Sequence, residues 1–191
     1  HDALPILISG KMKGFNLYMP KNKNTRPLKD LVRESIFNLL IHSKKINFDI
    51  KNANVLDLYA GSGSFGLECL SRGSKSVHFI EEKKEAIEIL KKNIDKLNIN
   101  KFTKILYGDV FNLIKKNYGL KFDLIFCDPP FKNNNIRELF ELIINNKMLN
   151  NKGVIIIHRQ KNTDDSFNSL IKIVDEKIYG VSKITFVKFS T

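Results

Sequence analysis

Short apolar runs alternate with amphipathic stretches along most of the chain. Residues 29–44 and 83–97 carry apolar side chains at the spacing of one helical face, and a further helix extends to about Arg72. Apolar runs predict strands at residues 54–60, 76–81, 103–108, 123–126 and 153–158. Two more, at 171–180 and 183–189, are separated by only two residues, which indicates a hairpin with an antiparallel last strand. The pattern predicts an α/β fold with a mostly parallel, seven-stranded sheet and helices on both faces.

The start of the chain has a different pattern. Residues 6–10 and 14–20 resemble two short strands around a Lys-Met-Lys turn, and residues 21–27 form a basic linker that ends in a proline. We therefore divide the chain into an N-terminal extension, residues 1–45, made of a basic hairpin, a linker and a helix, and a main domain, residues 46–191.

Positive charge is concentrated in this extension. The whole chain of 191 residues has a formal charge of +12 and an isoelectric point near 9.6. Residues 1–51 hold ten basic and four acidic side chains, a charge of +6 and half of the excess. Such asymmetry favours a polyanionic partner, although a general bias towards Lys, Asn and Ile would also raise the charge.

Two absences bear on the compartment. No apolar run is long enough to cross a bilayer, and the first residues lack the pattern of a secretory signal. Cys69 and Cys127 are the only cysteines, and without a secretory signal we expect free thiols. The prediction is a cytoplasmic protein.

The stretch DLIFCDPPF, residues 123–131, is the most informative part of the chain. Its apolar run predicts a buried parallel strand, and its two prolines predict a stiff turn just past the carboxyl end of that strand. Ligands of open α/β sheets bind at that edge. The turn would present the Asp128 carboxylate, backbone carbonyls and the Phe131 ring, which suit the amino group of a nucleobase. Strand alternation points Cys127 the other way, so we do not expect a catalytic thiol.

A glycine-rich turn is the second chemical feature. Gly61, Gly63 and Gly66 fit the pattern G-x-G-x-x-G between a strand and a helix, which is shared by proteins that bind NAD, FAD or S-adenosylmethionine. Glu81, twenty residues after Gly61, could accept the hydroxyls of a ribose. Asp57 would repel a pyrophosphate at this turn and attract a cationic ligand, unless it points into solvent or caps a backbone N–H. This charge favours S-adenosylmethionine.

At this point the chain resembles a known family. The segments VLDLYAGSGSFGLECLSRG, FIEEKKEA, YGDV and DPPF are similar to motifs of class I S-adenosylmethionine-dependent methyltransferases, and DPPF is typical of those that methylate nucleobase amines. The segments ISGKMKGFNLYMP, TRPLKDLVRESIFNLL and YGVSKITFVKF resemble the bacterial RsmD-type 16S ribosomal RNA guanine-N2 methyltransferases. The resemblance covers nearly the whole chain in the same order.

The resemblance implies a Rossmann-like class I methyltransferase fold, S-adenosylmethionine as cofactor, and a monomer. It implies transfer of a methyl group to the N2 amine of a guanine in 16S ribosomal RNA, in an assembled or nearly assembled small subunit. The implied catalytic residues are Asp128, Pro129, Pro130 and Phe131. The implied cofactor-binding residues are Asp57, Tyr59, Ala60, Gly61, Gly63, Glu81, Asp109, Val110 and Asp128. The candidate RNA-binding residues are Lys11, Lys13, Lys21, Lys23, Arg26 and Arg33.

Other interpretations remain open at this stage. A DNA or RNA adenine-N6 methyltransferase would share DPPF, a nicotinamide-dependent oxidoreductase would share the glycine pattern, and a non-catalytic RNA-binding module would share the charge. Arg33 could pair with Asp30 instead of binding RNA phosphate. The histidines show no metal-ligand spacing, so no metal is predicted, and His78 and His158 are interpreted as satisfied core residues.

Overall fold

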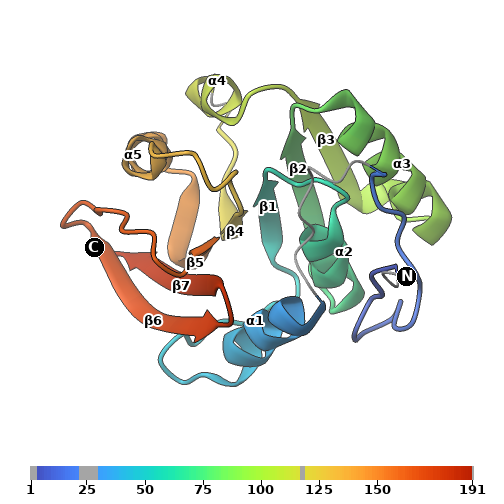
Figure 1. Ribbon diagram of the computed structural model, residues 1–191, viewed down its shortest axis with the longest axis horizontal. Helices are drawn as coiled ribbons and strands as arrows, with labels where there is room; N and C mark the ends of the chain where they lie inside the picture. The colour runs from blue at the N-terminus through green and yellow to red at the C-terminus, as the bar shows by residue number, and fades with distance from the viewer. Residues whose placement is uncertain (1–3, 22–29, 117–118, 191) are drawn as a thin grey trace.

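A seven-stranded sheet crosses the middle of the protein (Figure 1). The computed structural model describes residues 4–21, 30–116 and 119–190. The strand order is β3-β2-β1-β4-β5-β7-β6, with neighbouring strands parallel up to β5 and β7 antiparallel to both of its neighbours. The predicted fold class and antiparallel last strand are confirmed. The strands are β1 (Asn54–Leu58), β2 (Ser76–Glu81), β3 (Thr103–Tyr107), β4 (Phe122–Cys127), β5 (Leu149–Gln160), β6 (Ile171–Tyr179) and β7 (Ser182–Phe189).

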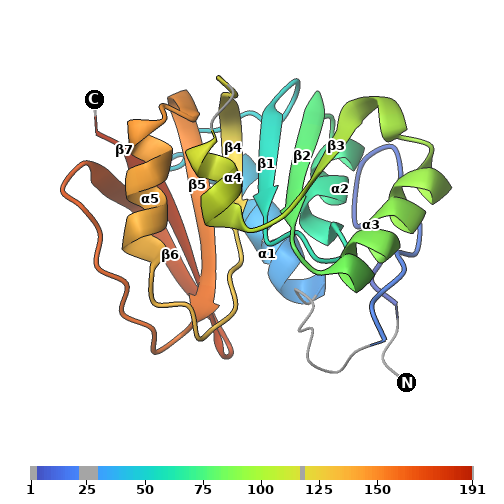
Figure 2. The ribbon, with the colours of Figure 1, turned by 90° about the horizontal axis from the view of Figure 1, so that it is seen from above.

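Helices cover both faces of the sheet (Figures 1 and 2). One face packs against α1 (Asp30–His42), α2 (Ser64–Ser71) and α3 (Lys84–Leu97). The other packs against α4 (Val110–Lys115) and α5 (Ile136–Asn145). A short 3-10 helix, η1 (Asn100–Phe102), precedes β3. Successive residues of the central strands enter alternate apolar layers, as the period of a strand requires.

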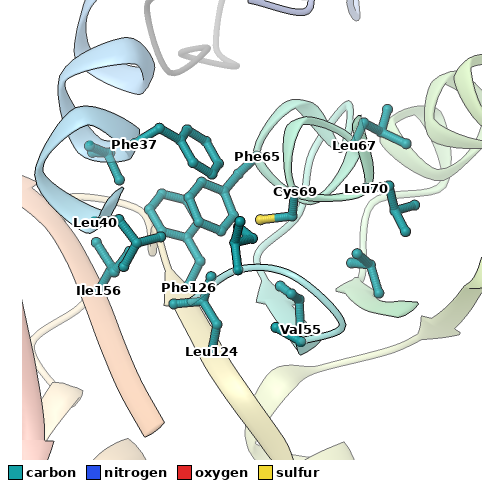
Figure 3. Packing of buried hydrophobic residues seen from close by; sticks show 14 of the residues in the cluster. Phe37, Leu40, Val55, Phe65, Leu67, Cys69, Leu70, Leu124, Phe126 and Ile156 are labelled. Carbon is teal, nitrogen blue, oxygen red and sulfur yellow. The ribbon is translucent and has the colours of Figure 1, made fainter. Parts of the chain in front are cut away.

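Three stacked phenylalanines join α1, α2 and β4 in the first layer (Figure 3). The Phe65 ring lies 3.9 Å from the Phe126 ring and 5.1 Å from the Phe37 ring, measured between centroids. Stacked aromatic pairs add about 0.5–1.5 kcal/mol beyond the area that they bury. This stack fixes α2 over the end of β4, where the candidate site lies.

The N-terminal extension differs from its prediction. Among residues 4–21, the two predicted strands reduce to one isolated antiparallel bridge between Ile6 and Asn16. Hydrogen bonds between the two segments run from the Leu7 N–H to the Phe15 carbonyl at 2.9 Å and from the Leu17 N–H to the Pro5 carbonyl at 2.8 Å. The outer edge of the segment is bound by side chains of the main domain instead: Glu68 accepts from the Ile8 N–H at 2.7 Å. The Asn93 amide accepts from the Tyr18 N–H at 2.7 Å. Most of the predicted linker lies outside the described residues.

The extension is nevertheless attached to the main core. Leu7 and Leu17, which are fully buried, belong to the same apolar cluster as α1, α2 and the sheet. The proposed domain boundary at residue 45 stays a prediction. Cys69 and Cys127 are buried free thiols. Among the described residues, no helix has the length and apolar content to span a membrane.

Gly66, the third glycine of the predicted pattern, lies where α2 approaches β2 most closely. A Cβ atom there would lie 2.4 Å from the Phe79 ring and 2.7 Å from a Val77 methyl. Both neighbours are packed core side chains with little room to move. The glycine therefore permits the close contact between helix and sheet that this motif requires.

We predict that Gly66→Ala lowers the free energy of unfolding by about 1–3 kcal/mol, as expected for overpacking. The gain in helix propensity, about 1 kcal/mol for alanine over glycine, offsets only part of the clash. Urea denaturation measures the difference, and Glu88→Ala on the exposed face of α3 serves as a control that should change little. A Gly66→Ala protein as stable as the parent would contradict this close packing.

Candidate active site

A cavity of about 400 Å³ opens at the carboxyl ends of β1, β2 and β4. Residues of the glycine-rich turn and of the DPPF motif both line it. This is the position predicted for a ligand site in an open α/β sheet. The predicted site residues that line it are Asp57, Tyr59, Ala60, Gly61, Glu81, Asp128, Pro129, Pro130 and Phe131. Further lining residues are Met19, Ser62, Ser64, Phe65, Glu82, Lys83, Ala86, Phe126, Lys132 and His158.

Three predicted cofactor residues do not line the cavity. Gly63 caps α2 with a φ of 84°, and a Cβ there would meet a Leu90 methyl at 2.3 Å, so packing explains this glycine. Asp109 caps α4 by accepting from the Asn112 N–H at 3.0 Å. Val110 is buried in the layer beneath α4. The predicted adenine contacts of Asp109 and Val110 stay predictions.

Asp57 is the fourth residue of β1, its carboxylate reaches the start of α2, and it is 2% exposed. Its carboxylate accepts from the Gly66 N–H at 3.0 Å, a donor in the first turn of α2 that the capping residue Gly63 has no side chain to satisfy. Burial raises the pKa of Asp57 well above its ordinary value, and the nearby Asp128 and Glu81 carboxylates raise it further. The side chain is thus both a helix cap and a buried carboxyl group that a cation would stabilise in its charged form.

Glu81 holds the glycine-rich turn from the end of β2. One carboxylate oxygen accepts from the Gly61 N–H at 2.8 Å, and the other accepts from the Glu82 N–H at 2.8 Å and the Lys83 N–H at 3.0 Å. Three backbone donors fix the direction of this carboxylate. It retains acceptor capacity towards the cavity, because an ionised carboxylate has about four acceptor positions.

The DPPF loop is held by two side chains from β5. The Nδ1 atom of His158 lies 2.8 Å from the Oδ1 atom of Asp128. Arg159, which is 1% exposed, donates to the carbonyls of Pro130 at 3.4 Å and Asn133 at 2.6 Å. Arg159 is itself fixed by Asp165, whose carboxylate lies 2.9 Å from the arginine Nε. Because His158 and Arg159 are successive residues of a strand, they hold the loop from opposite faces of the sheet.

The interpretation of His158 as a core residue was therefore incomplete. Its ring nitrogens are both satisfied, as expected, but the ring lines the cavity beside Asp128. The register explains this position, because Cys127 pairs with Ile157 on the neighbouring parallel strand and Asp128 and His158 come next. In the sequence, the only signal for this role was a histidine directly after an apolar run, at the end of GVIIIH. That signal does not identify a site residue until the pairing of β4 with β5 places His158 beside Asp128.

Tyr59 connects the two motifs across the cavity. It follows β1 with a φ of 57°, an unusual backbone conformation for a residue with a large side chain. Its hydroxyl contacts the Asn133 side chain, and burial raises the pKa of the phenol, so the hydroxyl is neutral near pH 7. The residue between β1 and the glycine-rich turn thereby contacts the loop that follows DPPF.

The candidate RNA-binding residues separate into three groups. Lys11, Lys13 and Lys21 are exposed, whereas Lys23 and Arg26 lie outside the described residues. The Lys11 N–H donates to Ser71 at the last turn of α2, so the 11–13 turn lies about one helix length, roughly 12 Å, from the start of α2 beside the cavity. Lys21 follows shortly after the cavity residue Met19.

The prediction for Arg33 as an RNA contact is wrong. Its side chain is fully buried, lies 3.1 Å from the Asp30 carboxylate, and donates to the Ile6 carbonyl. It also lies 3.8 Å from the Glu68 carboxylate. The alternative pairing with Asp30 is confirmed, and Arg33 joins α1 to the extension and to α2. Among the described residues, no group of His, Cys, Asp or Glu side chains is arranged to hold a metal ion.

Together, this sheet order and the cavity at its carboxyl edge define the Rossmann-like fold of class I methyltransferases. A family model described as "Conserved hypothetical protein 95" matches residues 6–188, so the chain belongs to this family, that of the RsmD-type methyltransferases. The chain is 38% identical over 157 residues to "Ribosomal RNA small subunit methyltransferase D" of Buchnera aphidicola subsp. Baizongia pistaciae, covering 82% of this chain and 76% of that protein.

Solved structures agree with the fold. A candidate methyltransferase, yhhF, from Escherichia coli superposes with a TM-score of 0.83 at 26% identity, and the match covers 97% of both chains. A second structure, SMU.776, described as a candidate methyltransferase complexed with SAH, has a TM-score of 0.63 at 16% identity over 78% of this chain and 48% of that one. The latter similarity bears on the fold alone.

We predict that Asp57→Asn raises stability at neutral pH and that the gain grows as pH rises. The raised pKa means that the folded wild-type protein binds a proton more tightly than the unfolded chain. Wild-type stability is therefore lost as pH rises from the ordinary carboxyl value of 3.8 towards the raised one, whereas asparagine does not titrate. Urea denaturation at pH 4.5 and pH 8 compares the two proteins, and an equal difference at both pH values would contradict a perturbed Asp57.

Proposed function

We propose that this protein transfers a methyl group from S-adenosylmethionine to the N2 amine of a guanine in 16S ribosomal RNA. The observation that carries the proposal is the acceptor group at the DPPF loop: Asp128, held by His158, and Pro129 line the same cavity as Asp57 and Glu81. The names of relatives, which specify small-subunit ribosomal RNA methyltransferases, support the substrate class.

The residues of the cavity suit S-adenosylmethionine. This molecule has an ammonium group, a sulfonium and a ribose, and no phosphate. Asp57 is a buried carboxyl group that a cation would stabilise, and Glu81 is fixed with acceptor capacity for ribose hydroxyls. The bound cofactor would supply an activated methyl carbon. The SAH complex of the structurally similar protein SMU.776 is consistent with this choice.

The acceptors at the DPPF loop suit an aromatic amine. The lone pair of guanine N2 is delocalised into the ring, so the nitrogen is a poor nucleophile. Hydrogen bonds from its two N–H groups to the Asp128 carboxylate and the Pro129 carbonyl would favour a pyramidal nitrogen whose lone pair points at the methyl carbon. The Pro130 carbonyl already accepts from the Asn133 N–H and from Arg159, which leaves Pro129 as the backbone acceptor of the motif.

Catalysis by this mechanism comes from positioning and electrostatics rather than from a strong base. The alkylated nitrogen is acidic and loses its proton readily. The guanine must first leave its stack, which costs a few kcal/mol, and stacking on Phe131 would recover about 1–3 kcal/mol. Phe131 lines the same cavity as these acceptors.

The extension supplies the surface for ribosomal RNA in this proposal. Lys21 follows soon after the cavity residue Met19 and would contact phosphates near the target base, and Lys11 and Lys13 would contact phosphates at a distance from it. Exposed lysines both at the 11–13 turn and after Met19 suit a large folded RNA, as in an assembled or nearly assembled small subunit. We propose a cytoplasmic monomer acting on that particle.

We predict that Asp128→Ala lowers the methylation rate by about 10²–10³-fold, the loss typical of a positioned polar group in a transition state. The cofactor affinity should fall far less than the rate, because Asp57 and Glu81 remain although Asp128 is also among the implied cofactor-binding residues. Small subunits that lack the modification are incubated with labelled cofactor, and calorimetry measures cofactor binding in parallel. A near-normal turnover by Asp128→Ala would exclude this mechanism.

Nucleoside mass spectrometry of the labelled RNA tests the substrate. Label in N2-methylguanosine from 16S ribosomal RNA supports the proposal. Label in N6-methyladenosine, or only in DNA, defeats it and indicates the other class of nucleobase amine. Binding of NAD in place of S-adenosylmethionine, or of neither molecule, would favour the oxidoreductase or the non-catalytic module.

A further inference from the structure

A chain of three polar side chains starts at the reactive acceptor and runs into the sheet. The Asp128 Oδ1 atom lies 2.8 Å from the His158 Nδ1 atom, and the His158 Nε2 atom lies 2.8 Å from the Ser182 Oγ atom. Asp128 directly follows β4, His158 lies in β5, and Ser182 is the first residue of β7. His158 and Ser182 are 6% and 7% exposed, so water competes little for these hydrogen bonds.

The donors and acceptors in this chain assign the tautomer of His158. An ionised carboxylate only accepts hydrogen bonds, so Nδ1 must carry the proton that faces Asp128. In a neutral imidazole Nε2 is then an acceptor, and the Ser182 hydroxyl donates to it. Asp128 thus selects the tautomer, and the Ser182 hydroxyl, which can donate or accept, completes it by donating to Nε2.

The same imidazole also touches the aromatic residue of the motif. The rings of His158 and Phe131 lie edge to face, with centroids 6.1 Å apart at an angle of 67°. One side chain therefore contacts both the acceptor for the target amine and the proposed stacking surface for the target base. Arg159 fixes the intervening backbone at Pro130 from the other face of the sheet.

We propose that His158 is a positioning residue of this methyltransferase: its Nδ1–H holds one oxygen of Asp128, so that the other oxygen faces the target amine. This inference rests on the proposed function. Asp128 is 22% exposed in its side chain and ends a strand, so without this bond its carboxylate could rotate between several orientations.

A hydrolytic role for the same three residues does not fit the geometry. The order Ser, His, Asp is that of a hydrolase triad, in which the serine hydroxyl must reach a substrate carbonyl. Ser182 is buried and is not among the residues that line the cavity. The reactive end of this chain is therefore the aspartate, and the serine is its interior support.

Matched substitutions of His158 separate the two ring nitrogens. In His158→Asn the amide nitrogen occupies the position of Nδ1 and keeps a donor for Asp128, whereas in His158→Gln the amide reaches towards Ser182 instead. We expect His158→Gln and His158→Leu to lower kcat about 100-fold, as for a misplaced reacting group, with cofactor Kd nearly unchanged. His158→Asn should recover most of the lost rate. Equal losses in all three variants, or no loss in His158→Leu, would overturn the proposal.

A measurement that is independent of activity covers the remaining cases. Nitrogen-15 NMR of the histidine side chains, assigned by comparison with His158→Asn, should show Nδ1 protonated and Nε2 unprotonated at pH 8. Ser182→Ala should keep Nδ1 protonated, because Asp128 sets the tautomer, and should lower kcat about two- to tenfold, the worth of one hydrogen bond. Protonation at Nε2 alone would overturn the assignment. If the wild-type protein methylates no small subunit, the proposed function is wrong. The NMR result would still show whether His158 donates to Asp128 from Nδ1.

Discussion

Three parallel strands, β1, β4 and β5, lie side by side, and their registers decide which side chains meet at the cavity. Asp57, Asp128 and His158 each stand at the carboxyl edge and face the α1–α2–α3 side. A slip of one residue in β4 would turn Asp128 to the opposite face and bring Cys127 into the cavity. The packing on both faces opposes such a slip, because Phe126 stacks on Phe65 while Cys127 is buried in the layer beneath α5. The same alternation of side chains along the strands therefore forms the two core layers and points Asp57, Asp128 and His158 towards the cavity.

Helix α2 connects the N-terminal extension to the elements that form the cavity. Its buried Glu68 accepts from the backbone of Ile8 and lies within ion-pair distance of Arg33 and Arg72. Removing one partner of such a buried cluster typically costs about 3–5 kcal/mol, because the others keep an uncompensated charge. At the other end of the segment, Asn93 bonds to both Tyr18 and the Ser62 carbonyl of the glycine-rich turn. The extension is thus fixed at both ends to parts of the main domain that support the cavity.

The sequence was sufficient for features that local pattern or charge controls. Strand–helix alternation predicted the sheet and its antiparallel end, and Pro129, Gly61 and Glu81 lie in the cavity as the motifs required. The failures involve partners that are distant in the chain. Residues 6–10 and 14–20 have the pattern of strands, but they share one bridge only, and their outer N–H groups donate to side chains of α2 and α3. Arg33 is of a residue type that often binds phosphate, but the buried Glu68 lies beside it. His158 acquires its role only through pairing with β4.

The hydrogen bonds at the start of α2 distinguish this cavity from a dinucleotide site built on the same glycine pattern. A pyrophosphate usually binds the free N–H groups at the N-terminus of that helix. Here Asp57 already accepts from the Gly66 N–H, so a phosphate would lose a donor and meet a buried carboxyl group. The Gly61 N–H is likewise taken by Glu81. Because backbone donors of the protein itself hold these acceptors, the cavity presents a fixed set of oxygen atoms. Such a surface selects cations and N–H or O–H donors, and it repels the anion that the glycine pattern alone would lead one to expect.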